Sequence, residues 1–77
     1  MSKLRLVPYS LLSKLAERLG FRWKRCVGSH NTFRHADGRI VVIPNHASQV
    51  IVRPLLRKIV RDLGISVDDY NRLLDEL

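Results

Sequence analysis

The segment GSHNTFRHADG, residues 28–38, holds the side chain best suited to chemistry, His30, directly after a Gly-Ser pair. The unperturbed pKa of histidine is roughly 6.5, so its ring takes up and releases protons near neutral pH. RNA carries a 2′-hydroxyl beside each phosphate, and a base that deprotonates it starts an internal transesterification without a metal. We therefore predict that His30 is a general acid/base in RNA cleavage. His35 and His46 are weaker candidates for the same role.

This reaction also needs cations that hold the phosphate and offset charge in the transition state. Basic residues flank His30, and four more share one side of a helix expected after residue 53. The alternative for these four is a merely solvated face. We also predict that Lys24 or Arg25, rather than a second histidine, polarises the attacking 2′-hydroxyl. The predicted RNA contacts are Lys24, Arg25, Ser29, Arg34, Arg53, Arg57, Lys58 and Arg61.

Other site chemistries find little support in the sequence. Cys26 is the single cysteine, so no disulfide framework forms and a reducing compartment is expected. The spacing of Cys26 and the histidines is unlike paired zinc-ligand motifs, and no Gly-rich phosphate loop occurs, so we predict no metal and no cofactor. No apolar run approaches the roughly 18 residues that span a membrane, and no signal-peptide pattern is found. The cytoplasm is the expected location.

The charge of the chain is strongly positive and unevenly distributed. The 77 residues carry a net charge of +7 and have a pI near 10.6. Residues 1–61 hold 13 Lys or Arg against two acidic residues, a net +11, whereas residues 62–77 hold one Arg against five acidic residues, a net −4. A basic body with an acidic end indicates a surface that binds a polyanion and a segment kept away from it.

The pattern of apolar residues predicts three helices and three strands in one domain, residues 1–77. Helices are expected over residues 10–19 and 54–63 and after Ser66, a good helix N-cap. Strands are expected at 21–27, 30–35 and 40–43, joined by a Gly-Ser turn and an Asp-Gly hairpin. We predict an α+β fold of order α-β-β-β-α-α, with a three-stranded antiparallel sheet and helices on one face. This is the arrangement of a double-stranded-RNA-binding domain with a short extra C-terminal helix.

The side chains of a strand point alternately to its two faces, which predicts what the uncovered face carries. Phe33 and the aromatic residues Phe21 and Trp23 are assigned to the core. The uncovered face should then gather a histidine, a cysteine and several polar or basic residues: Arg22, Lys24, Cys26, His30, Thr32 and Arg34. A β-bulge would invert the pattern, and Gly28 beside the turn is one place for it.

Four stretches of the chain resemble the HicA-type mRNA interferase toxins of bacterial and archaeal toxin–antitoxin pairs. They are LAERLGF, GSHNTF, DGRIVVIPNH and LLRKIVRDLGISVDDY, and together they cover about residues 10–74. The resemblance implies a double-stranded-RNA-binding-like fold and metal-free, ribosome-independent cleavage of mRNA. The family's catalytic histidine corresponds to His30, and His46 matches a further family position without a catalytic role. The resemblance also implies a HicB-type antitoxin, and a basic toxin face would attract an acidic partner.

Two other functions fit the same residues. A non-catalytic RNA-binding module would use the basic side of the second helix, and its salt-sensitive affinity for duplex RNA would be indifferent to His30. A structural interaction protein would use its basic face only for an acidic protein partner and would not bind RNA at physiological salt. We favour the RNA endonuclease toxin, with mRNA and a HicB-type acidic antitoxin as its partners.

Overall fold

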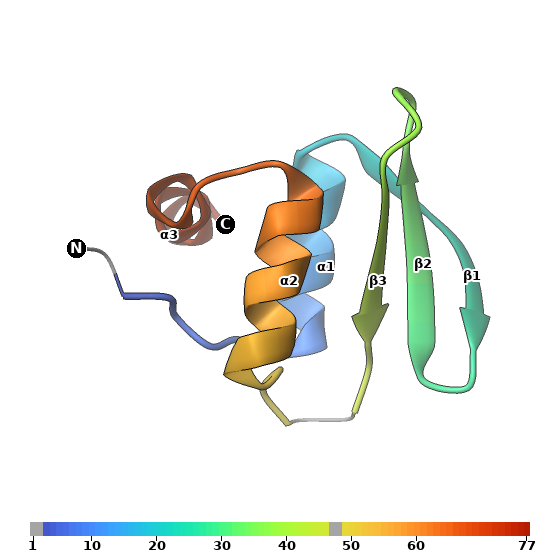
Figure 1. The fold of residues 1–77 in the computed structure, drawn as a ribbon, viewed down its shortest axis with the longest axis horizontal. Helices are drawn as coiled ribbons and strands as arrows, with labels where there is room; N and C mark the ends of the chain where they lie inside the picture. The colour runs from blue at the N-terminus through green and yellow to red at the C-terminus, as the bar shows by residue number, and fades with distance from the viewer. Residues whose placement is uncertain (1–2, 47–48) are drawn as a thin grey trace.

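The computed structural model describes residues 3–46 and 49–77 and confirms the predicted order of helices and strands (Figure 1). The strands form one antiparallel sheet in the order β1-β2-β3. Each predicted boundary agrees with the observed one to within a residue. The elements are α1 (Tyr9–Arg18), β1 (Phe21–Val27), β2 (His30–His35), β3 (Ile40–Pro44), α2 (Arg53–Leu63) and α3 (Val67–Glu76).

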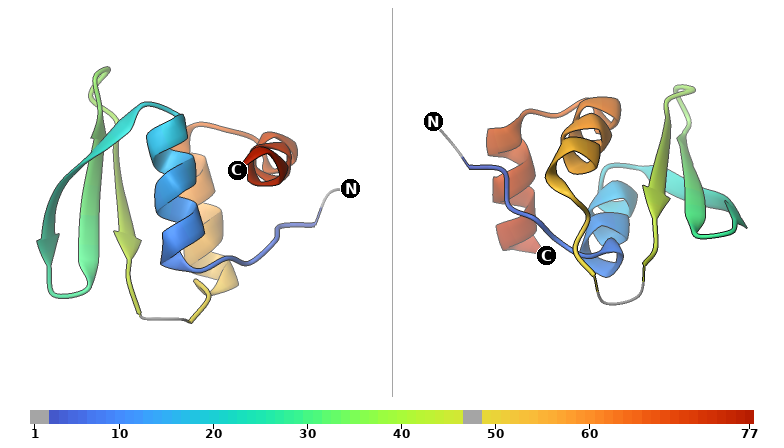
Figure 2. Two further views of the ribbon diagram at one scale, coloured as in Figure 1. Left: turned by 180° about the vertical axis from the view of Figure 1, so that it is seen from behind. Right: turned by 60° about the horizontal axis from the view of Figure 1, so that its bottom comes forward.

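The helices lie on one side of the sheet. α1 and α2 pack against it, and α3 lies beyond them, farthest from the strands (Figures 1 and 2). No helix of the described residues covers the other side. The predicted α+β architecture with one uncovered sheet face is therefore confirmed.

The core lies between the sheet and the helices and is built from the predicted apolar stripes. Apolar residues recur every three or four positions in α1 and α2, so they fall on the side of each helix that meets the sheet. Each strand contributes alternate residues. The most deeply buried side chains are Leu12, Leu15, Phe21, Phe33, Val41, Ile43, Leu56, Ile59, Leu63 and Tyr70.

The segment before α1 is tied to both later helices. The buried Tyr70 of α3 donates its hydroxyl hydrogen to the Arg5 carbonyl at 2.7 Å. At the start of α2, the Arg53 guanidinium donates to the Leu4 carbonyl at 2.9 Å. No pattern in the sequence indicates these contacts, because they join residues more than 45 positions apart along the chain.

Tyr70 makes the stability of the fold depend on pH in the alkaline range. Burial raises the pKa of the Tyr70 phenol to about 12 from an ordinary 10.0, and the Arg5 charge offsets this only in part. The unfolded chain therefore releases the phenol proton first, and stability that is fully present below pH 10 is lost as the pH rises toward 12. Between pH 10 and pH 12, we expect the wild type to lose up to roughly 3 kcal/mol of folding stability relative to Tyr70→Phe.

Near neutral pH the wild type should instead be the more stable of the two proteins. Tyr70→Phe lacks the hydrogen bond to Arg5, so it should be less stable than the wild type by about 1 kcal/mol. Urea unfolding of both proteins near neutral pH and at the highest pH that keeps them soluble measures the two differences. A difference that stays constant with pH would contradict the assigned role of the phenol.

A β-bulge in β1 corrects the predicted placement of side chains. The register shifts between Trp23 and Arg25, which leaves Lys24 as the extra residue. The alternation inverts at this point, so Cys26 pairs with the buried Asn31 and lies on the side of the helices. The prediction that Cys26 lies on the uncovered face is wrong, and Arg25 takes its place there.

Trp23 is not a core residue, contrary to the prediction. Its side chain is 53% exposed, although it pairs with the buried Phe33. The reason is position, because β1 is an edge strand and the helices do not cover it at Trp23. The indole N–H instead donates to Asn31 Oδ1 at 3.0 Å. Trp23, on the edge strand, thus supplies a hydrogen-bond donor for the buried side-chain amide of Asn31.

Candidate active site

The uncovered face of the sheet consists of three rows, each with one residue from every strand. The row at the Gly-Ser turn holds a histidine between two apolar residues, the middle row holds one cation, and the far row holds two. From the turn outward, the rows are Val27, His30 and Pro44; then Arg25, Thr32 and Val42; then Arg22, Arg34 and Ile40. We call these residues the open face.

His30 occupies the first position of β2 and is exposed. Gly28 in the preceding turn has φ of 60°, a left-handed conformation that glycine adopts without strain. The Asn45 N–H donates to the Ser29 carbonyl at 2.8 Å and fastens the turn to the chain after β3. Within residues 3–46 and 49–77 the imidazole has no hydrogen-bond or ion-pair partner. The fold therefore presents at a fixed point on the open face an exposed imidazole that has no partner among the described residues.

Asn31 holds the turn from the inner side of the sheet. Its side chain is only 7% exposed. Its Oδ1 accepts the indole hydrogen of Trp23, and its Nδ2 donates to the Ser29 carbonyl at 3.3 Å. A buried amide needs such partners, so the network fixes the backbone on both sides of His30. Sequence reasoning missed Asn31, although a polar residue at an inward strand position was the available signal.

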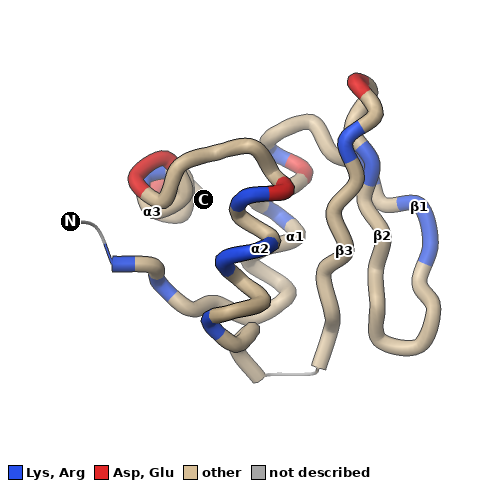
Figure 3. The backbone as a smooth tube through the Cα atoms, in the orientation of Figure 1, with Lys and Arg blue, Asp and Glu red and all other residues tan. Residues whose placement is uncertain are grey.

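Of the cations predicted to surround His30, only Arg25 lies beside it on the open face. Arg25 occupies the diagonal position across β1 and β2, where such pairs lie roughly 7–8 Å apart. Arg34 stands four residues farther along β2, and Lys24 is the bulge residue. Figure 3 shows no Lys or Arg along the turn and strand ends around His30. Arg25 is therefore the cation of the sheet best placed to meet a phosphate at His30.

The basic residues of α2 belong to a different surface. They lie in the helix layer and not on the sheet (Figure 3). Arg53 is bound to the Leu4 carbonyl, and Lys58 forms an ion pair with Asp62 at 2.7 Å. Arg57 and Arg61 are exposed and have no partner in the part of the chain that the structure describes. The predicted RNA contacts therefore divide between the sheet and α2.

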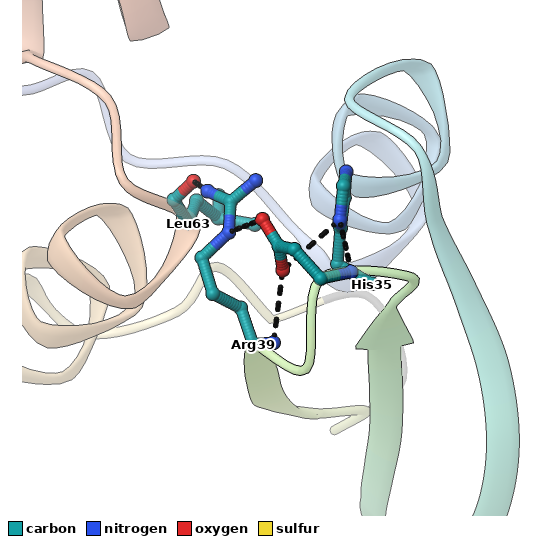
Figure 4. A network of polar contacts seen from close by, with 4 residues as sticks. His35, Arg39 and Leu63 are labelled. Carbon is teal, nitrogen blue, oxygen red and sulfur yellow. Dashed lines mark hydrogen bonds and ion pairs between the residues drawn. The ribbon is translucent and has the colours of Figure 1, made fainter.

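His35 belongs to a structural network beside the open face. Its ring meets Phe21 edge-on with centroids 5.2 Å apart, and its Nδ1 lies 3.0 Å from Asp37 Oδ1. Arg39 Nε donates to the other oxygen of Asp37 at 2.8 Å, and Arg39 Nη1 donates to the Leu63 carbonyl at 2.7 Å (Figure 4). The backbone N–H of Arg39, above all, holds the pKa of Asp37 below its ordinary value. The network ties the β2–β3 hairpin to the end of α2.

His46 is the remaining histidine of the chain. His46 is exposed in the segment after β3. Among the described residues, no three His, Cys, Asp or Glu side chains come together to hold a metal ion. None of the described helices is long and apolar enough to cross a membrane.

The fold and the site define a small basic α+β domain, with the element order of a double-stranded-RNA-binding domain and an exposed histidine on its open sheet face. The family model described as the HicA toxin of bacterial toxin–antitoxin systems matches residues 11–65, from α1 to the loop after α2. The chain therefore belongs to the HicA toxin family, which confirms the resemblance seen in the sequence. It is a toxin of a toxin–antitoxin pair, and its partner is an antitoxin. No curated protein matches the chain significantly.

Proposed function

We propose that the protein is a metal-independent endonuclease of mRNA in which His30 is the general acid/base. The observation that supports this best is the exposed imidazole of His30, which has no partner among the described residues and lies on the open face of a chain with net charge +7. The cytoplasm, where mRNA is found, is the proposed location. Toxicity would follow from the loss of intact message.

The reaction follows from the chemistry of a single histidine beside RNA. His30 removes the proton of a 2′-hydroxyl, and the oxygen attacks the adjacent phosphorus. The bond from phosphorus to the 5′-oxygen of the next nucleotide breaks, and that oxygen receives the proton that His30 took up. The products are a 2′,3′-cyclic phosphate and a 5′-hydroxyl, so atoms and charge balance without a cofactor.

Arg25 is the proposed partner of His30 in this reaction. It shares the open face with His30 and lies diagonally across the strands. Its positively charged guanidinium would offset the charge on the phosphate oxygens and polarise the 2′-hydroxyl. Lys24, the alternative predicted from the sequence, is the neighbouring bulge residue, but it lines a pocket at the end of the sheet opposite to His30.

We also propose that the antitoxin is an acidic, HicB-type protein that covers the open face. This face combines cations with the exposed apolar side chains Val27, Ile40 and Val42. Exposed apolar area beside charged groups is typical of surfaces that bind another protein, and the cations favour an acidic one. An acidic partner bound there would screen His30 from RNA.

A pair of matched RNAs tests the proposed chemistry. The first is a mixed-sequence single strand, and the second is the same strand with every 2′-hydroxyl methylated. We expect the protein to bind both and to cleave only the first, leaving 2′,3′-cyclic phosphate ends. Cleavage of the methylated strand would contradict the mechanism. Binding of both strands without cleavage would favour the RNA-binding module, which the exposed Arg57 and Arg61 of α2 would serve.

A further inference from the structure

A second candidate site lies at the end of the sheet opposite to His30. A surface pocket of about 310 Å³ opens there, and its lining carries three cations, one histidine and no carboxylate. We call it the arginine pocket. Its lining residues are Gly20, Arg22, Lys24, Arg34, His35 and Ala36.

Two of its cations repel each other in the free protein. Arg22 and Arg34 pair directly across β1 and β2, and like charges in this arrangement destabilise a sheet. Both are exposed, and neither has an ion-pair partner within residues 3–46 and 49–77. The nearby carboxylate of Asp37 is already bound by Arg39. An anion from outside the chain would relieve the repulsion.

Gly20 contributes to the lining of the arginine pocket beside His35. Gly20 has φ of +96°, and a Cβ at this position would come within 3.0 Å of His35 Nε2. Glycine therefore leaves room for the histidine ring in the lining. Lys24, the bulge residue, adds its charge beside Arg22 and Arg34. Arginine binds phosphate through paired N–H···O bonds, so two facing arginines suit one phosphate group.

We infer that the arginine pocket binds a backbone phosphate of the RNA strand other than the phosphate cleaved at His30. This inference rests on the proposed action on RNA and adds a subsite to it. Arg34 lies four positions after His30 along β2, a distance of about 13 Å at ~3.3 Å per residue. One phosphate does not span that distance. The strand therefore runs along the open face, past Arg25 in the middle row.

Binding of fully 2′-O-methylated single-stranded RNA tests the arginine pocket separately from cleavage. The pocket variant is R22Q/R34Q. The matched control, K14Q/R18Q, removes the same charge from two exposed residues of α1. In the pocket variant alone, we expect affinity at low salt to fall roughly tenfold. The slope of log K against log salt should also become shallower, by roughly 0.7 for each phosphate that the protein no longer neutralises.

Thermal melting distinguishes weaker binding by a folded protein from unfolding. The pocket variant should melt at or above the wild-type temperature, because a pair of like charges has been removed. A lower melting temperature together with weaker binding would overturn the assignment of these arginines to ligand binding.

The other outcomes also decide the inference. Equal losses of affinity in the pocket variant and the control would show that only net charge matters, and would overturn the site. A loss confined to R57Q/R61Q would move RNA binding to α2 and overturn it as well. A pocket variant that keeps its RNA affinity but loses antitoxin binding would also overturn the inference, because the pocket would then bind a protein carboxylate.

Cleavage of the unmodified RNA, measured in parallel, keeps the two claims apart. A wild type that binds methylated RNA through the arginine pocket but leaves unmodified RNA intact would contradict the proposed function and support the pocket. A wild type that cleaves RNA, beside a pocket variant with unchanged affinity and salt slope, would overturn the pocket and leave the proposed function standing.

Discussion

Replacing His30 with alanine is expected to lower the rate of RNA cleavage by roughly 10²–10⁴-fold, the usual contribution of a positioned general acid/base. The stability of the folded protein should change little. The ring is exposed and has no partner among the described residues, so stability should stay within about 0.5 kcal/mol of the wild type. Initial cleavage rates at saturating RNA, with melting temperatures of both proteins, measure the two effects.

His46→Ala is the matched control for this prediction. His46 is also an exposed histidine, but it lies in the segment after β3 and not on the open face. Its replacement should leave the cleavage rate near that of the wild type. A His30→Ala protein that cleaves RNA almost as fast as the wild type would remove His30 from the mechanism. Equal losses in both variants would also speak against a specific role for His30.

Replacing Phe33 with alanine should destabilise the protein by roughly 3–5 kcal/mol, the usual cost of deleting a fully buried phenyl ring. Phe33 is 1% exposed, lies in the middle of the central strand and packs near Tyr9. The whole stability of a domain of this size is only about 4–12 kcal/mol. The variant should therefore melt more than 10 °C below the wild type, at ~4–8 °C per kcal/mol. Circular dichroism on heating measures the shift.

Phe33→Leu separates the structural role of this aromatic from a role in RNA binding. Leucine keeps most of the apolar volume, so the loss of stability should be roughly 1 kcal/mol and the folded variant should cleave RNA normally. A Phe33→Leu protein that folds but no longer cleaves RNA would place the ring in the substrate site. A Phe33→Ala protein as stable as the wild type would contradict its position in the core.

The fold could be predicted from the sequence because local signals agree with one another. The Gly-Ser and Asp-Gly turns set both hairpins, and the helical period of apolar residues marks α1 and α2. The bulge at Lys24 could not be predicted, because no residue in FRWKRCV distinguishes a regular edge strand from a bulged one. That single residue decides whether Arg25 or Cys26 shares a face with His30.

The site could be predicted only in part, because spacing along the chain does not give distance across a sheet. His30 was assigned to the uncovered face from alternation with Phe33, and the structure places it there. The sequence did not predict which cations lie close together. Arg22 and Arg34 form a pair only once the register is known, and Arg53 is bound to a carbonyl of the N-terminal segment, an interaction that no local pattern encodes.

The central claim, cleavage of RNA through His30 without a metal, is tested most directly with purified protein and a mixed-sequence mRNA in the presence of EDTA. The wild type and His30→Ala are compared after circular dichroism has shown both to be folded. We predict that the wild type cleaves equally well with and without EDTA, and that His30→Ala binds the RNA but leaves it intact. Loss of wild-type cleavage in EDTA, or binding without cleavage by both proteins, would contradict the account.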